Sequence, residues 1–154
     1  MKKNFTSEEI KKSHATNVKA SGSLYLLAGV LCLVYIVRYF ITQNFNFYFT
    51  LAVPDMLLKL GDSGEMGKVL SVLLAAAFML VYFIIGIAVV KKPKLFPIMT
   101  VTYLLDTVCL FFCDFILWQR PQSTDFLIDI ICHIWVLLFL VVGMRSQRVI
   151  DKEN

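Results

Sequence analysis

Four long apolar stretches constrain what this chain can fold into more than any other feature. They are Ser23–Thr42, Val69–Val90, Phe96–Trp118 and Thr124–Met144. Each is close to the ~20 residues that a helix needs to cross the hydrocarbon core of a bilayer. Each must be helical, because unpaired backbone groups cannot face lipid, and none shows the alternation of a membrane barrel strand. We therefore predict an all-α integral membrane protein.

Composition supports this class. Hydrophobic residues make up 58 % of the chain, charged residues 17 %, and the mean hydropathy is +0.74. A soluble domain has about 45–50 % apolar and about 25 % charged residues. These values exclude a soluble globular enzyme, a disordered protein and a disulfide-stapled secreted domain. The 154 residues also leave little chain for a catalytic domain outside the membrane.

Short loops predict how the spans are arranged. The segments 91–94 and 119–122 separate the last three stretches, and each contains a proline that ends the preceding helix. Loops of this length make consecutive helices antiparallel. We predict an antiparallel four-helix transmembrane bundle spanning residues 23–144, with a basic tail at 1–22 and a second tail at 145–154.

The distribution of lysine and arginine predicts the orientation. The two tails and the loop at 91–94 together carry eleven of these residues, whereas the opposite side carries three, which are Lys59, Lys68 and Arg120. The positive-inside rule then places both termini in the cytoplasm. The basic flanks account for most of the formal net charge of +4, so we expect no nucleic-acid partner. We assign the protein to a bacterial plasma membrane.

The loop at 43–68 is the only long one, and it predicts a short amphipathic helix. Pro54 suits the first helical position, and the segment 62–64 would end the helix. The apolar face would consist of Met56, Leu57 and Leu60, and the charged face of Asp55 and Lys59. We predict an interfacial helix that seals the outer end of the bundle. The alternative is a lid or an external binding surface.

Ionisable side chains inside the spans are the candidate functional residues. They are Arg38, Asp106, Asp114, Asp129 and His133. Burying one such charge in a bilayer costs about 2.5–3.5 kcal/mol, so each needs a partner or a purpose. At ~1.5 Å of rise per residue, Arg38 and Asp129 both lie roughly 22 Å from the cytoplasmic end. Asp106 and His133 both lie at roughly 15–17 Å, so we predict one contact at each level, with Asp114, which lies somewhat higher, as the alternative partner of Arg38.

Helical spacing also predicts which sides of the spans face each other. One stripe on the third stretch consists of Thr102, Asp106, Cys109 and Cys113, and one on the fourth consists of Asp125, Asp129, Cys132 and His133. Polar stripes on neighbouring antiparallel helices are expected to face each other, away from lipid. Arg38 would complete this group.

Three interpretations of the polar group remain open. In the first, the contacts are structural and fix the register of the bundle. In the second, Arg38, Asp106, Asp114, Asp129 and His133 form a proton or ion pathway. In the third, Asp106, Cys109, Cys132 and His133 hold a metal or a haem, although no specific ligand motif supports such a site.

No nucleotide-binding, serine-hydrolase, zinc-protease or paired CxxC motif occurs in the sequence. Our main hypothesis is a non-enzymatic accessory, regulatory or scaffold component without a cofactor. Its partners would be the bilayer and another membrane protein or a second copy of the chain. The alternative is a small oligomeric proton- or ion-linked transporter or channel. A third hypothesis is an intramembrane metal protein or enzyme.

Overall fold

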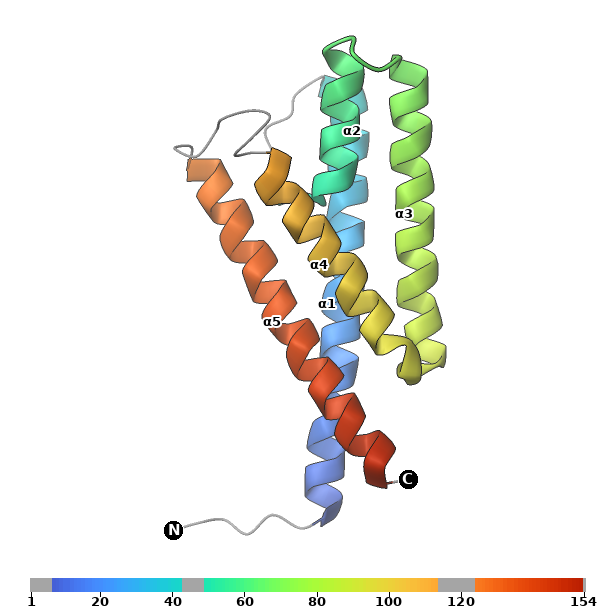
Figure 1. Ribbon diagram of the computed structural model, residues 1–154, viewed down its shortest axis with the longest axis vertical. Coiled ribbons are helices and arrows are strands. Elements are labelled where there is room, and N and C mark those ends of the chain that lie inside the picture. The colour runs from blue at the N-terminus through green and yellow to red at the C-terminus, as the bar shows by residue number, and fades with distance from the viewer. Residues whose placement is uncertain (1–6, 43–48, 114–123, 154) are drawn as a thin grey trace.

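The computed structural model describes residues 7–42, 49–113 and 124–153, and its regular secondary structure in these ranges consists of helices (Figure 1). The elements are α1 (Ser7–Thr42), α2 (Ala52–Asp62), α3 (Lys68–Lys91), a 3-10 turn η1 (Pro93–Leu95), α4 (Phe96–Phe112) and α5 (Thr124–Glu153). Four segments are long and apolar enough to cross a membrane; they lie in α1, in α3, in η1 with α4, and in α5.

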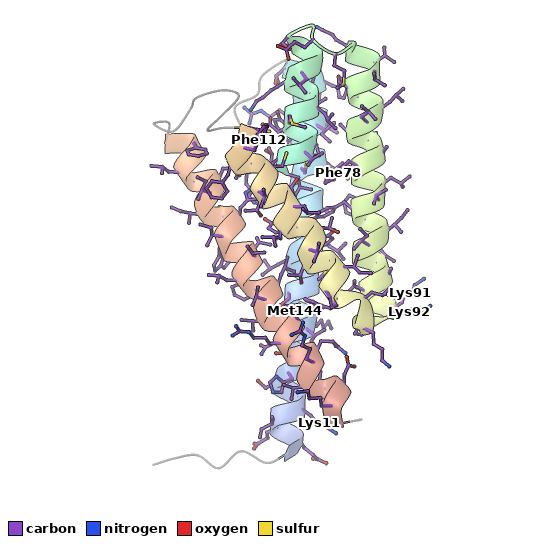
Figure 2. The ribbon with its side chains drawn as sticks, viewed as in Figure 1. Lys11, Phe78, Lys91, Lys92, Phe112 and Met144 are labelled. Atoms are coloured by element: carbon purple, nitrogen blue, oxygen red, sulfur yellow. The ribbon has the colours of Figure 1, made fainter. Side chains whose placement is uncertain are left out.

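The direction of the chain can be followed in Figure 1. It runs upward along α1 and α2, downward along α3, upward along α4 and downward along α5. The first residues of α1 and the last residues of α5 therefore lie at the same end of the molecule. Lys11, Lys91 and Lys92 lie toward this end, whereas Phe112 lies toward the other (Figure 2).

The outer surface of the helices is apolar. In each candidate span, only 28–39 % of the residues in the most apolar window are buried. Leucine, isoleucine and valine side chains are exposed along α1, α3, α4 and α5. Apolar surface of this extent is costly in water, and it suits contact with lipid. The four long helices thus support a membrane-embedded protein.

Two helices extend beyond the predicted spans. α1 begins at Ser7, and α5 continues to Glu153, so most of the predicted tails are helical. These extensions pack together, since His14 Nδ1 lies 3.1 Å from Ser146 Oγ. Higher up, Ser21 Oγ donates a 2.7 Å hydrogen bond to the Phe139 carbonyl. The predicted end of the third span at Trp118 lies outside the described residues.

A stripe of buried side chains on α1 forms one wall of the core. Its members are Tyr25, Ala28, Cys32, Tyr35 and Tyr39. They follow alternating spacings of three and four residues, which keeps them on one helix face. The ring of Tyr25 stacks on Tyr82 of α3, with centroids 3.9 Å apart. The Tyr82 hydroxyl donates a 3.0 Å hydrogen bond to the Tyr25 carbonyl, so the two helices are in direct contact.

A short helix does form in the long loop, but its buried side differs from the prediction. α2 lies alongside the upper parts of α1 and α3 (Figure 1). Its buried residues are Ala52, Pro54, Leu58 and Gly61, whereas Met56 and Leu57 are only half-buried. The reason is that α2 begins before Pro54, with its first turn held inside the bundle by residues of α4.

Candidate functional site

A carboxylate from another helix caps the first turn of α2. Asp106 of α4 is 1 % exposed. Its Oδ2 accepts a 3.1 Å hydrogen bond from the Ala52 N–H, and its Oδ1 accepts a 3.0 Å hydrogen bond from the Val53 N–H. A helix N-terminus leaves such N–H groups unpaired and carries a partial positive charge. Leu51, at the capping position, has no side-chain hydrogen-bonding group, so Asp106 performs the capping instead.

His133 of α5 lies between two carboxylates and is fully buried. Its Nε2 is 3.5 Å from Asp106 Oδ2, and its Nδ1 is 3.2 Å from Asp129 Oδ1. The same Nδ1 is 2.9 Å from the Asp129 carbonyl oxygen, which can only accept a hydrogen bond. This contact is a hydrogen bond in the tautomer that carries its proton on Nδ1. The Nε2 atom has no hydrogen-bond partner among the described residues, so it lies at ion-pair distance from Asp106 without a hydrogen bond.

The segment that precedes α2 covers this polar cluster of Asp106, Asp129 and His133. The Phe49 ring lies 5.0 Å from the His133 ring, measured between centroids. The backbone N–H groups of Ala52 and Val53 reach the Asp106 carboxylate, and they offset part of the cost of burying its negative charge.

Tyrosine rings pack beside His133 of the cluster. Tyr103 of α4 stacks beside His133 at a centroid distance of 5.7 Å, and Tyr25 lies 6.3 Å from Tyr103. Both hydroxyl groups are buried, and neither has a hydrogen-bond partner among the described residues. Two polar groups with open hydrogen-bonding capacity therefore lie beside the contact between Asp106 and His133.

The structure confirms one of the two contacts predicted from depth. Asp106 and His133 meet, as their matched levels indicated. The contact predicted between Arg38 and Asp129 is not formed, since Arg38 is exposed on α1 and no ion pair joins it to Asp129 in the described ranges. Arg38 lies off the buried stripe of α1, which depth alone does not reveal. Asp114 lies outside the described residues.

The cysteines of the predicted stripes remain thiols. Cys109 and Cys132 are half-buried and free, and the Cys109 sulfur lies 3.7 Å from the Cys113 sulfur on the same helix. Within the ranges that the structure describes, no group of three or more His, Cys, Asp or Glu side chains is arranged to hold a metal ion. The residues considered for a metal site are therefore not gathered around one point.

A second polar contact, not predicted, anchors the other side of α2. The Tyr35 hydroxyl of α1 donates a hydrogen bond to Asp55, and Lys59 pairs with the same carboxylate. The spacing of the tyrosines on α1 was the available sequence signal, because it marks a buried face. The backbone donors of residues 52 and 53 have no side-chain signal at all, so sequence patterns could not reveal them.

Comparisons of the chain with protein families, with curated proteins and with solved structures find no match.

Proposed function

We propose that this chain is a non-enzymatic component of a membrane, with an accessory, regulatory or scaffold role, and that its polar cluster holds α2 inside the bundle. One observation carries the proposal: both oxygens of Asp106 accept backbone N–H groups from the start of α2. A carboxylate used in this way stabilises the fold and is not free to act on a substrate. Buried polar contacts between spans supply specificity that lipid cannot supply.

The arrangement in the bilayer is part of the proposal. The four long helices would cross as an antiparallel bundle, with both termini in the cytoplasm of a bacterial cell. The eleven lysine and arginine residues that the sequence carries in the two tails and in the loop at 91–94 support this orientation. The partner would be another membrane protein or a second copy of the chain, since little mass lies outside the bundle.

A proton-linked transporter or channel is the second candidate, and one specific observation favours it. His133 lies between Asp106 and Asp129 and beside the unpartnered hydroxyls of Tyr25 and Tyr103, and buried groups of these types form proton relays in membranes. In this candidate Asp129 would pass the proton toward the outer end, and several copies of the chain would enclose the path.

Proton flux through reconstituted protein separates the two candidates. The full chain is placed in liposomes that contain a pH-sensitive dye, and a potassium diffusion potential drives protons inward. We expect the same flux as in empty liposomes, because the cluster is closed by residues 49–53. Asp129→Asn is expected to give the same flux as the parent chain.

The opposite result would also decide between the two candidate functions. If the parent chain conducts protons and Asp129→Asn abolishes conduction while its thermal unfolding stays cooperative, the cluster is a pathway and the scaffold proposal is wrong. Asp62→Asn is the matched control, since Asp62 is an exposed carboxylate at the far end of α2. It removes the same charge without touching the cluster.

A further inference from the structure

A cavity of about 640 Å³ opens between α1, the end of α3 with η1, and the end of α5. Its volume falls within the range of about 300–1,000 Å³ that is typical of ligand sites. It lies toward the end of the molecule where the basic residues gather, and it is separate from the polar cluster. Neither proposed function uses it.

The wall of this cavity changes in character along its length. Leu26, Val89 and Val90 line the part inside the predicted spans, and they offer an apolar surface. Lys19 and Lys94 line the part beyond the span ends, and both are exposed. Apolar walls that lead to paired cations match a molecule with an apolar chain and an anionic head.

The acidic side chain that lines the cavity already has a hydrogen-bond partner. Asp151 lies at the rim, and its Oδ1 accepts a 3.0 Å hydrogen bond from the Gln147 side-chain amide. The two lysine ammonium groups outnumber this one carboxylate, so the rim keeps a net positive charge. Basic pockets between spans on the cytoplasmic side are typical binding sites for anionic lipid head groups.

We propose that this cavity, between Lys19 and Lys94, binds one anionic phospholipid. Its phosphate would lie between the two ammonium groups, and an acyl chain would lie along Leu26, Val89 and Val90. The position at the span ends places the head group at the depth where lipid phosphates lie in the bilayer. Cytoplasmic leaflets are rich in anionic lipid, so the ligand is available there.

The first test measures lipid binding to the purified full chain in detergent by native mass spectrometry. Phosphatidylglycerol and phosphatidylcholine are titrated separately. We expect tighter binding of phosphatidylglycerol, and we expect Lys19→Gln with Lys94→Gln to weaken it about tenfold to thirtyfold. The control is Lys91→Gln with Lys92→Gln, which removes the same charge at the same end, from residues at the edge of the bundle (Figure 2).

The second test fills the cavity. A Cβ atom built on Gly22 meets no atom within 4 Å, and Gly22 lines the cavity. Gly22→Leu should therefore fold normally and reduce phosphatidylglycerol binding at least as much as the lysine pair. Ser23→Leu is the second variant if Gly22→Leu does not fold, since Ser23 also lines the cavity and is exposed.

Three results would overturn the proposal. The first is an equal loss of binding in the Lys91 and Lys92 control, which would indicate attraction by general charge. The second is parental binding in the folded cavity-filling variant. The third is displacement of the lipid by water-soluble glycerol phosphate at a similar concentration, which would mean that the head group alone is recognised.

Discussion

At the scale of single residues, Asp106 joins three helices through one carboxylate. It belongs to α4, accepts N–H groups from the start of α2, and contacts His133 of α5. Each contact offsets part of the cost of burying its charge. Removal of this side chain should therefore affect the position of α2 more than the stability of the four long helices.

We expect Asp106→Asn to lower the free energy of unfolding by about 1–3 kcal/mol, because an amide has only one oxygen to offer the two N–H groups. Asp106→Leu leaves His133 and both N–H groups without this partner, and we expect a loss of about 3–5 kcal/mol. Thermal or denaturant unfolding in detergent measures both losses. Asp62→Asn is the control, and a loss in it as large as in Asp106→Asn would contradict the capping role.

A different result is expected for Arg38. Its side chain is exposed near the last turn of α1, where a long side chain can extend past the end of an apolar helix. Arg38→Leu should change the free energy of unfolding by less than about 0.5 kcal/mol. The same unfolding measurement checks this value. A loss above ~2 kcal/mol that Asp129→Leu restores would show a buried pair instead.

At the scale of elements, α2 differs from the four long helices in its length. Its eleven residues span about 16 Å, roughly half the thickness of a hydrocarbon core. Its first turn lies against Asp106, and Asp55 in the same turn bonds to Tyr35. The contacts along α2 explain why the helix lies beside α1 and α3.

Cysteine labelling tests the position of α2. In a chain whose own four cysteines are replaced by alanine, we expect Ser63→Cys to react quickly with a membrane-impermeant maleimide in proteoliposomes. Ala52→Cys should react only after denaturation, because Ala52 is 3 % exposed. Equal labelling of the two positions would indicate a helix that lies at the surface.

At the scale of the whole molecule, α1 and α5 pack along much of their length and continue past the predicted span ends. Close approach at their crossing depends on Gly143, where a Cβ atom would lie 2.5 Å from Ser21 Oγ and 2.6 Å from Phe96 Cζ. The crossing brings the basic ends of both helices together, and this gives the molecule one strongly positive end.

The positive end makes the orientation testable. We expect a fluorescent protein fused after Asn154 to fluoresce in cells, and alkaline phosphatase fused there to be inactive, since both report a cytoplasmic C-terminus. Substitution of Lys91, Lys92 and Lys94 by Gln should weaken this preference. Active phosphatase at the C-terminus of the parent chain would reverse the proposed topology.

Part of the polar cluster could be predicted from the sequence. Depth along the helices was sufficient to match Asp106 with His133, because both positions lie inside regular helices with a constant rise per residue. The same estimate failed for Arg38, since depth does not specify direction around the helix axis. The partners of Asp106 in α2 are backbone groups, and every residue type except proline has the same N–H group.

The sequence by itself determined the class of the protein and the extent of its apolar helices. Span formation depends on the hydropathy of consecutive residues, so the stretches that include Leu27 and Leu80 could be recognised without knowledge of their neighbours. Only the tertiary structure decided where α2 lies and which side it buries. That choice depends on the carboxylate of Asp106, which lies far from α2 in the chain and meets it only after α4 has packed.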